Sequence, residues 1–468
     1  MNITTSGKKN QGSVLLVALL TAWVIGIALV SYLTLVASQN RSTYHSQTWN
    51  ACIPVLEAGV EEALNQIHYA GIAANLGANQ WTYNAADGQY HKTRTLTDSE
   101  GSYYQVGIQP IDPRGEPHGP VIVSSGYVVA PANTGTPMGG QSAFGMILGT
   151  VSGILSPPTP RYLSRTVLVT TRHRPPGDGG INAKSRIDIS GGAYFDSFDS
   201  SNPNFNTAGR YDPTKRSANA KAVTNLGTAD AINVGGGTIF GSVATGAEGD
   251  VTIGAGSVGD LGWGASQSGI QREPTDHQSD DANIQFDDVS PPFVYGTGLT
   301  PMSGISRALT GLPILYTWLL DSGNYQMGSV SISGGRIMLV TGNATLYVNG
   351  NFSTSGGGGV YLAPGASLKL YIGGIASVSG NGIVNKFGTS RNLSIFGLNS
   401  STAFSYTGTS EFVGTVYAPH AAVKFSGGAA AFGAFTGETV TINGGAHVAY
   451  DEDLKKTGDF VMDSWNEI

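Results

Sequence analysis

Residues 13–37 read SVLLVALLTAWVIGIALVSYLTLVA and contain no charged side chain. As an α-helix, these ~25 residues would extend about 37 Å, which is enough to cross a hydrocarbon core of about 30 Å with some tilt. The few polar side chains in the run, such as Thr21 and Thr34, can donate hydrogen bonds to carbonyl groups of their own helix. The run therefore predicts a transmembrane helix.

The charges on either side of this run predict its orientation. Lys8 and Lys9 precede it, whereas Arg41 stands alone after it. The positive-inside rule then predicts a single-pass inner-membrane protein. Its N-terminus lies in the cytoplasm, and the bulk of the chain lies in the periplasm or outside the cell. A cleaved secretory signal is the alternative, but its apolar region is usually about 7–15 residues long, shorter than this run.

The helical pattern continues beyond the apolar run. Apolar residues recur at spacings of three and four, namely Ile53, Leu56, Val60, Leu64 and Ile67, while Glu57, Glu61 and Glu62 occupy the other side. Pro54 lies inside this pattern and is expected to kink the helix rather than end it. We therefore expect one long helix over residues 13–79, membrane-embedded at its start and amphipathic at its end.

The N-terminal region resembles a type IV prepilin. Residues 1–12 form a short basic leader that ends at Gly12, Ser13 follows, and then come the apolar run and the proline-bearing extension. Residues 12–20 and 56–64 resemble most closely the PilX-type segment of minor pilus-assembly proteins. The resemblance implies cleavage after Gly12 by a prepilin peptidase and packing of the helix among other pilin subunits. Val17 stands where most pilins carry a glutamate.

Composition limits the remaining possibilities. The chain has 468 residues, of which 67 are glycine and 12% are charged, and its formal net charge is −7. This length suggests two or three domains. The net charge makes a nucleic-acid partner improbable. Cys52 is the single cysteine, so no internal disulfide can form and no thiolate metal cluster is expected.

Residues 80–174 predict a small β-rich module of the kind found in a pilin head. Segments 102–109, 121–125 and 162–171 are rich in β-branched and aromatic residues and are separated by turns. Residues 130–160 form a Gly- and Pro-containing insertion, which we interpret as an excursion between strands, with a contact to another subunit as the alternative. A linker is expected at 175–181, where Pro-Pro and Gly-Gly pairs break regular structure.

Residues 182–450 predict a glycine-rich β-solenoid. Short alternating strands that end in glycine recur, with Val330–Gly335, Leu346–Gly350, Leu370–Gly374, Val423–Gly428 and Val440–Gly445 as the clearest examples. A β-sandwich is the competing fold. We expect a mainly β protein in which a right-handed parallel β-helix follows the helix and small sheet, and in which residues 451–468 form a C-terminal cap or tail. Residues 181–468 also resemble an uncharacterised domain of bacterial surface proteins, which implies location and architecture only.

A search for chemistry finds no catalytic site, so we expect no enzyme, no cofactor and no bound metal. Asp196, Asp199 and Asp212 could bind calcium, but carboxylates in Ser/Asn-rich loops more often form Asx-turns. The acidic stretch around Asp276 to Asp288 is interpreted as a solvated connector. Outward-facing residues such as Tyr347, Tyr371 and Thr441 could contact glycans weakly.

Three functions remain possible from the sequence. The first is a non-catalytic, membrane-anchored minor pilin-like subunit that displays a β-solenoid for adhesion or subunit contacts. The second is a membrane-tethered surface adhesin or carbohydrate-binding protein. The third is a β-helix polysaccharide-degrading enzyme, which the scarcity of carboxylates disfavours.

Overall fold

The computed structural model describes residues 11–70, 72–73, 75–96, 101–110, 118–130, 162–173, 179–303, 316–407, 411–457 and 460–468. The chain divides into two compact units. Unit 1 comprises Met1–Arg172 and Phe460–Ile468, and unit 2 comprises His173–Asp459. Unit 2 is therefore inserted into the sequence of unit 1. The separate helix and sheet domains expected from the sequence, with a boundary after residue 79, belong to one unit.

Unit 1 begins with the expected long helix. Helix α1 spans Gln11–Asn65 and is followed by the π-helical turn η1, Gln66–Ala70. The helix continues through Pro54, whose side chain is exposed. Helix α1 and the turn η1 together end at Ala70, before the expected limit of 79. One side of the second half of α1 is buried, through Cys52, Val55, Leu56, Val60 and Ala63, and Ile67 of η1 is buried in the same cluster.

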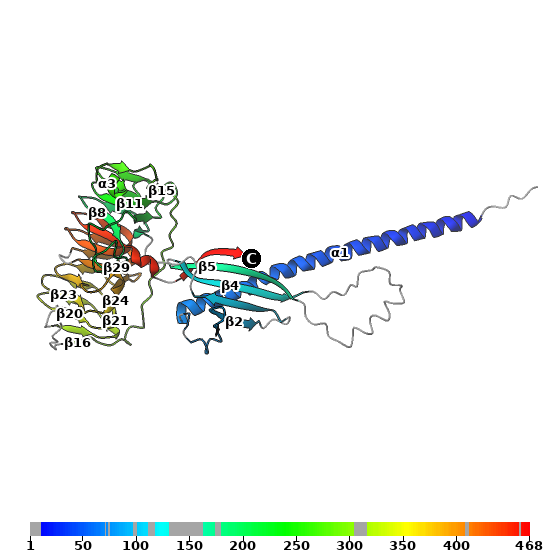
Figure 1. Ribbon diagram of the computed structural model, residues 1–468, viewed down its shortest axis with the longest axis horizontal. Coiled ribbons are helices and arrows are strands. Elements are labelled where there is room, and N and C mark those ends of the chain that lie inside the picture. The colour runs from blue at the N-terminus through cyan, green and yellow to red at the C-terminus, as the bar shows by residue number, and fades with distance from the viewer. Residues whose placement is uncertain are drawn as a thin grey trace, which may run out of the picture. The chain divides into compact units, whose positions relative to one another are not determined.

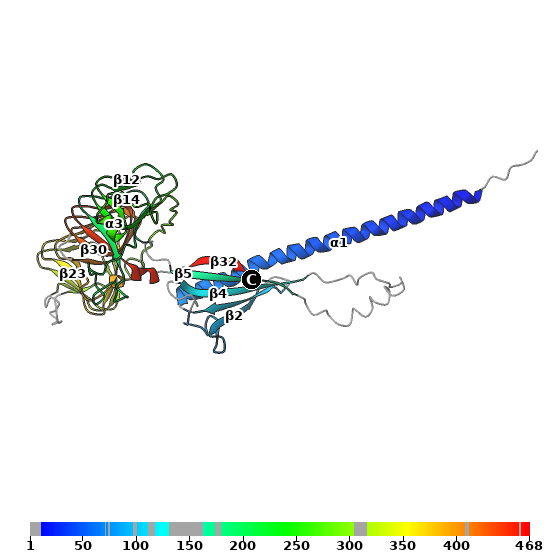
Figure 2. The same ribbon diagram turned by 45° about the horizontal axis from the view of Figure 1, so that its top comes forward.

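The buried side of α1 packs on an antiparallel sheet (Figure 2). The sheet has the order β1-β2-β3-β4-β5-β32. Its strands are β1 (Thr82–Asn84), β2 (Gln89–Thr95), β3 (Tyr103–Gln109), β4 (His118–Val129), β5 (Tyr162–His173) and β32 (Phe460–Glu467). The strands expected from the sequence at 102–109, 121–125 and 162–171 are therefore confirmed. Residues 131–160 of the expected insertion lie outside the described residues.

Two glycines allow the helix and the sheet to approach closely. A Cβ atom on Gly126 of β4 would lie 2.5 Å from the carbonyl oxygen of Cys52, and one on Gly59 of α1 would lie 2.3 Å from Ser124 Oγ. Ser124 Oγ donates a hydrogen bond to the carbonyl oxygen of Leu56 at 2.7 Å. At Gly126 a larger side chain would meet the helix backbone, so the helix and the strand would have to move apart, whereas at Gly59 it would displace the Ser124 side chain.

The final strand corrects one prediction from the sequence. Residues 451–468 were expected to form a single cap or tail, but β32 lies beside β5 in the sheet of unit 1. Its contacts run antiparallel to β5, because Asp463 is near Arg172, Ser464 is near Thr170 and Glu467 is near Arg165. The described part of the expected cap that belongs to unit 2 runs from Asp451 to Thr457 and includes the 3₁₀ turn η3 (Glu452–Lys456). Sequence periodicity could not place β32, because pairing with β5 joins residues almost 300 positions apart.

Unit 2 is built from short strands in parallel rungs. In residues 316–407, each rung contributes one strand to each of three columns, and each strand pairs in parallel with the strand three positions later. The first column is β17 (Trp318–Leu320), β20 (Ile337–Val340), β23 (Gly359–Leu362) and β26 (Gly382–Val384). The second is β18 (Gly323–Met327), β21 (Asn343–Val348), β24 (Ser367–Ile372) and β27 (Leu393–Gly397). The third is β19 (Val330–Ile332), β22 (Phe352–Thr354), β25 (Ala376–Val378) and β28 (Ala403–Tyr406).

Longer strands continue this stack. Strand β29 (Phe412–Phe425) crosses the second and third columns, β30 (Ala430–Ile442) pairs with it in parallel, and β31 (His447–Asp451) follows. At the opposite end, β16 (Met302–Ser303) pairs antiparallel with β17. The short turn η2 (Ser390–Asn392) precedes β27.

The first rung of unit 2 lies beside its last rung. Strands β6 (Gly180–Ala183) and β7 (Ile187–Ile189) pair in parallel with β30, and β8 (Tyr194–Phe198) pairs in parallel with β31. We call this junction the seam. Because β6 begins at Gly180, the linker expected at 175–181 extends two residues too far.

The strands that follow β8 in the sequence stack on one side of the first rung. The strands from β16 to β31 form the stack on its other side. The strands that follow β8 are β9 (Ala220–Thr224), β10 (Ile232–Val234), β11 (Thr238–Ala244), β12 (Val251–Ile253), β13 (Ser257–Gly259), β14 (Gly269–Ile270) and β15 (Gln278–Ser279), with the short helix α3 (Leu261–Gly264). In Figure 1 the green strands of residues 180–279 lie at one end of unit 2, the yellow strands lie at the other, and the orange and red strands lie between them. The strand order in space therefore differs from the order in sequence.

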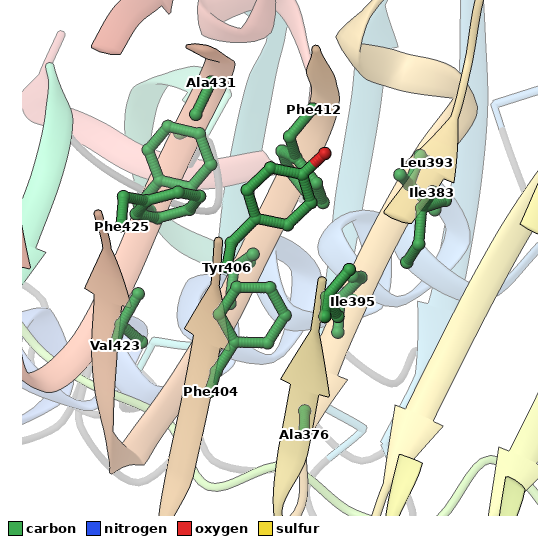
Figure 3. Packing of buried hydrophobic residues seen from close by; sticks show 14 of the residues in the cluster. Ala376, Ile383, Leu393, Ile395, Phe404, Tyr406, Phe412, Val423, Phe425 and Ala431 are labelled. Atoms are coloured by element: carbon green, nitrogen blue, oxygen red, sulfur yellow. The ribbon is translucent and has the colours of Figure 1, made fainter. Parts of the chain in front are cut away.

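The interior of unit 2 consists of apolar ladders. Val378, Tyr406, Phe425, Ile442 and Ile189 occupy consecutive register positions, and all are at most 1% exposed. Figure 3 shows the rings of Phe404, Tyr406, Phe412 and Phe425 gathered between the strands. The ring centroids of Phe425 and Phe435 are 4.6 Å apart. Ile442 therefore faces the interior of unit 2.

Candidate functional site

The first half of α1 exposes a continuous apolar surface within unit 1. The segment beginning at Val14 has a mean hydropathy of 2.6 in its most apolar window, and none of that window is buried. Val14, Leu15 and Trp23 are each at least 70% exposed. It is long and apolar enough to cross a membrane, as the sequence predicted. Thr21 and Thr34 donate hydrogen bonds to carbonyl groups of their own helix, so they present little unsatisfied polarity.

The predicted processing residues lie at the start of this surface. Gly12 and Ser13 belong to the first turn of α1. Lys8 and Lys9, which predict the membrane orientation, lie outside the described residues. Pro54 lies where α1 begins to pack on the sheet, between the buried residues Cys52 and Val55. The helix therefore has two consecutive parts, one exposed and apolar, and one that forms the core of unit 1.

A charged cluster that the sequence did not reveal anchors the end of α1. Glu62 accepts hydrogen bonds from Lys92 Nζ at 2.6 Å, Tyr104 Oη at 2.6 Å and Arg94 NH1 at 3.0 Å. Lys92 also donates to the carbonyl oxygen of Asn79 at 2.6 Å. The sequence placed Glu62 on the solvent side with Glu57 and Glu61. Lys92 and Arg94 are two positions apart in a strand, so their side chains lie on the same face of the sheet. Two basic residues on one face could have indicated an acidic partner on the helix.

The pKa values in this cluster follow from burial and hydrogen bonding. Burial alone would raise the pKa of the Glu62 carboxyl, but the hydrogen bonds from Lys92, Tyr104 and Arg94 outweigh it and lower that pKa. Burial and the hydrogen bond to Glu62 raise the pKa of Tyr104 to about 12. Two hollows of about 250 and 520 Å³ flank the cluster and share Glu62 and Asn65. Because Lys92 and Arg94 are already paired with Glu62, we interpret the cluster as structural.

Replacing Glu62 with glutamine tests this interpretation. The lowered pKa of Glu62 in the folded state means that its contribution is present above its ordinary pKa of 4.5 and is lost as pH falls through the lowered value. We expect Glu62→Gln to reduce the free energy of unfolding of unit 1 by about 1–3 kcal/mol at pH 7, and by much less at pH 3. Urea unfolding followed by tryptophan fluorescence measures both values. Glu61→Gln is the matched control, since Glu61 is exposed, and an equal loss in both variants would contradict the assignment.

Two of the three acidic residues considered for calcium in unit 2 form local turns. Asp199 Oδ1 accepts hydrogen bonds from the backbone N–H and the hydroxyl of Ser201, at 2.8 and 2.6 Å. Asp212 Oδ1 accepts the equivalent pair from Thr214, at 2.9 and 2.7 Å. Hydrogen bonds from Thr207 and Thr214 lower the pKa of Asp212 to about 2. The Asx-turn interpretation is confirmed for these two residues.

The third, Asp196, is fully buried at the seam. It accepts hydrogen bonds from Tyr211 Oη at 2.6 Å and pairs with His447 Nε2 at 3.0 Å, while Arg216 lies 3.5 Å away. The His447 ring stacks on Tyr194 with centroids 4.0 Å apart. Burial and the Asp196 charge raise the pKa of Tyr211. Asp196 and His447 are paired like a catalytic dyad, but aromatic rings pack around the imidazole. We interpret the cluster as a contact that stabilises the pairing of the first rung with the last.

A connector of residues 280–301 covers part of the outer face that was considered for glycan contact. Tyr347, Tyr371, Phe396 and Tyr417 occupy consecutive positions on the second column. Tyr347 is only 6% exposed and packs with Val289 of the connector. Tyr371 and Phe396 stack on each other with centroids 4.6 Å apart, so one face of each ring is occupied. Tyr347 and Tyr371 are therefore poor candidates for stacking on sugars.

The acidic stretch from Asp276 to Asp288, which overlaps the start of this connector, is less solvated than the sequence suggested. His277 within it is buried, and its Nδ1 lies 2.7 Å from the carbonyl oxygen of Gly241. Asp288 pairs with His420 at 2.6 Å, and Tyr417 Oη donates to the carbonyl oxygen of Asp287 at 2.9 Å. Asp280 and Asp281 are exposed, as expected. Within the described part of the chain, no group of three or more His, Cys, Asp or Glu residues could hold a metal ion.

A known protein family matches part of unit 2, and a solved structure loosely matches most of the chain. Residues 313–457 match the model of a family described as a domain of unknown function (DUF7305). The match runs from just before β17 to just after η3 and lies within the region in which the sequence resembles an uncharacterised domain. No curated protein matches the chain. Among solved structures, the chain is similar to the competence-associated pilin ComZ from Thermus thermophilus, with 13% identity, 91% of this chain and 97% of that chain covered, and a TM-score of 0.22. This superposition is too loose to transfer function from one protein to the other.

Proposed function

We propose that the chain is a non-catalytic, membrane-anchored pilin-like subunit that displays unit 2 on the extracytoplasmic side of the inner membrane. The observation that carries the proposal is the division of α1 into an exposed apolar half and a half that forms the core with an antiparallel sheet. A helix used only as a membrane anchor has no need to continue into the core of the unit that follows. In this chain the two parts are one continuous helix, 55 residues long.

The resemblance of the leader supports handling by the pilus machinery. In this proposal a prepilin peptidase cleaves after Gly12, and the apolar half of α1 moves from membrane lipid into contact with the helices of other pilin or pseudopilin subunits. Lys8 and Lys9 keep the leader on the cytoplasmic side. Unit 2 then lies outside, where its low content of charged residues and rigid rungs suit display rather than acid–base chemistry.

We infer that the rungs of unit 2 wind as a right-handed parallel β-helix. Parallel pairing of each strand with the strand three positions later supports this, because a chain that returns to the same column after each rung follows a helical path. Parallel crossover connections are right-handed in about 98% of cases. Such a rod can serve adhesion, contact with neighbouring subunits, or weak binding of glycans.

Site-specific photocrosslinking tests the proposed packing of α1. A photoreactive residue at Trp23, which is 70% exposed in unit 1, is expected to form crosslinks with other pilin-like subunits in intact cells. The matched control carries the same residue at Glu57, on the exposed side of the core half. Crosslinks from position 23 to lipid alone, in cells that assemble pili, would favour a simple membrane tether. Recovery of the protein in the soluble fraction would overturn the membrane location.

A further inference from the structure

The sheet of unit 1 is completed by a strand that follows unit 2 in the sequence. Strand β5 ends at His173, where unit 2 begins, and β32 begins at Phe460, directly after unit 2. The two strands are neighbours in the sheet. Unit 1 therefore cannot have all six strands until the roughly 290 residues of unit 2 have been made and have brought the chain back.

The folded unit 2 brings its own two ends together. A Cβ atom on Gly180, in the first strand, would lie 2.8 Å from the Cβ atom of Tyr450, in the last. This closeness depends on the seam, because it is the pairing of β6 and β8 with β30 and β31 that sets the first rung beside the last. A β-helix with its rungs stacked in sequence order would instead place its ends at opposite ends of the rod.

Strand β32 contacts β5 along its length and reaches the turn η1, which follows α1, at its first residue. Arg165 Nε donates to Glu467 Oε1 at 2.7 Å, and the same guanidinium lies 5.4 Å from the ring centroid of Trp49. At the other end, His68 Nε2 is 2.5 Å from the carbonyl oxygen of Phe460. Between them, Thr170 and Ser464 hydroxyls are 2.7 Å apart. These contacts hold β32 against β5 and against the turn that ends the long helix, while Arg165 links the pair of strands to Trp49 of α1.

We propose that β32 is a closing strand, which completes the helix-bearing unit only after unit 2 has folded. When unit 2 is unfolded, the ends of a loop of about 290 residues meet roughly a thousandfold less often than ends held close together. The β32 segment then dissociates from β5, and β5 becomes the edge strand of the sheet, with unpaired backbone N–H and C=O groups. A subunit with a misfolded unit 2 thus carries a loosened helix–sheet unit. The closing strand couples the folding of the displayed unit to the integrity of the unit that bears the membrane helix.

Hydrogen exchange on the full chain in detergent tests this coupling, and it needs no pilus machinery. Val378→Asp places a charge in the interior of unit 2, whereas Ser377→Asp places the same charge on the adjacent exposed residue. We expect Val378→Asp to raise exchange about tenfold or more in peptides covering β5 and β32, besides those of unit 2. Ser377→Asp is expected to leave β5 at the parent rate. Full protection of β5 and β32 in a Val378→Asp chain whose unit 2 exchanges freely would overturn the proposal.

A second pair of variants loosens the closing strand while leaving unit 2 intact. Glu467→Arg sets two guanidinium groups against each other, and Asn466→Arg places the same side chain at the neighbouring exposed residue. We expect Glu467→Arg to raise exchange in β5 severalfold with unit 2 unchanged, and Asn466→Arg to have little effect. Equal exchange in the parent and both variants would show that β32 does not hold β5, and would contradict the proposal without bearing on assembly into pili.

Discussion

Replacing Ile442 with aspartate is expected to unfold unit 2 at ambient temperature, with a loss of more than about 4 kcal/mol in the free energy of unfolding. Ile442 is fully buried, and its register neighbours are Phe425 on one side and Ile189 on the other. A carboxylate there would have no polar partner, and it would lie in the seam that joins the two halves of unit 2. The loss is therefore expected to exceed that of a simple cavity.

Urea unfolding followed by circular dichroism measures this loss. Ser426→Asp is the control: it introduces the same side chain at a half-buried turn position, directly before Gly427. We expect a change of less than about 1 kcal/mol for this variant. Comparable damage from the two substitutions would contradict the inward assignment of the ladder that contains Ile442.

The second large effect concerns where a soluble fragment must begin. A chain of residues 38–468 is expected to be soluble and monomeric, because it lacks the exposed apolar run but keeps the packed half of α1. A chain of residues 80–468 is expected to aggregate. It loses Cys52, Leu56, Val60 and the other helix residues that cover β3 and β4, and each buried apolar side chain contributes about 1.5–3 kcal/mol.

Size-exclusion chromatography of the two fragments decides between these outcomes. The comparison is informative because the sequence alone favours a boundary near residue 80, where the helical periodicity ends. Monomeric behaviour of the 80–468 fragment with an intact sheet would show that α1 is dispensable for unit 1. It would remove the main argument that the helix is built into the unit rather than attached to it.

The sequence predicted the elements better than their pairing. The apolar run, the spacing of Leu56, Val60 and Ile67, and the strand–Gly–Gly units each follow from local periodicity. The seam does not, because the repeated units look alike and nothing in one unit specifies which other unit lies beside it. For the same reason, the pairing of β32 with β5 could not be inferred from residues 460–467 alone.

The candidate site shows the same division between local and long-range information. Asp199 and Asp212 were interpreted correctly because an Asx-turn depends only on the next two residues. Glu62 was misplaced because its partners Lys92 and Arg94 come from a strand some 30 residues away. Tyr347 was assigned to the correct face of its strand, but the connector that covers it arrives from outside the repeat.

The family match covers only one of the two halves of unit 2. It covers residues 313–457, the half of unit 2 that winds back toward the seam. The half formed by residues 180–279 continues the same parallel pairing across the seam and is fastened there by the Asp196–His447 contact. The two halves of unit 2 are therefore joined into one β-structure at the seam.

The mature N-terminus tests the central claim most directly. Protein purified from the membranes or filaments of its own cells is expected to begin at Ser13, because a basic leader ending in Gly12 directly precedes the apolar helix. Mass-spectrometric mapping of the N-terminal peptide gives the answer in one measurement. A start at Ser13 is the result the account predicts; an intact Met1, or a start near Ser38 after removal of the apolar run, would contradict it.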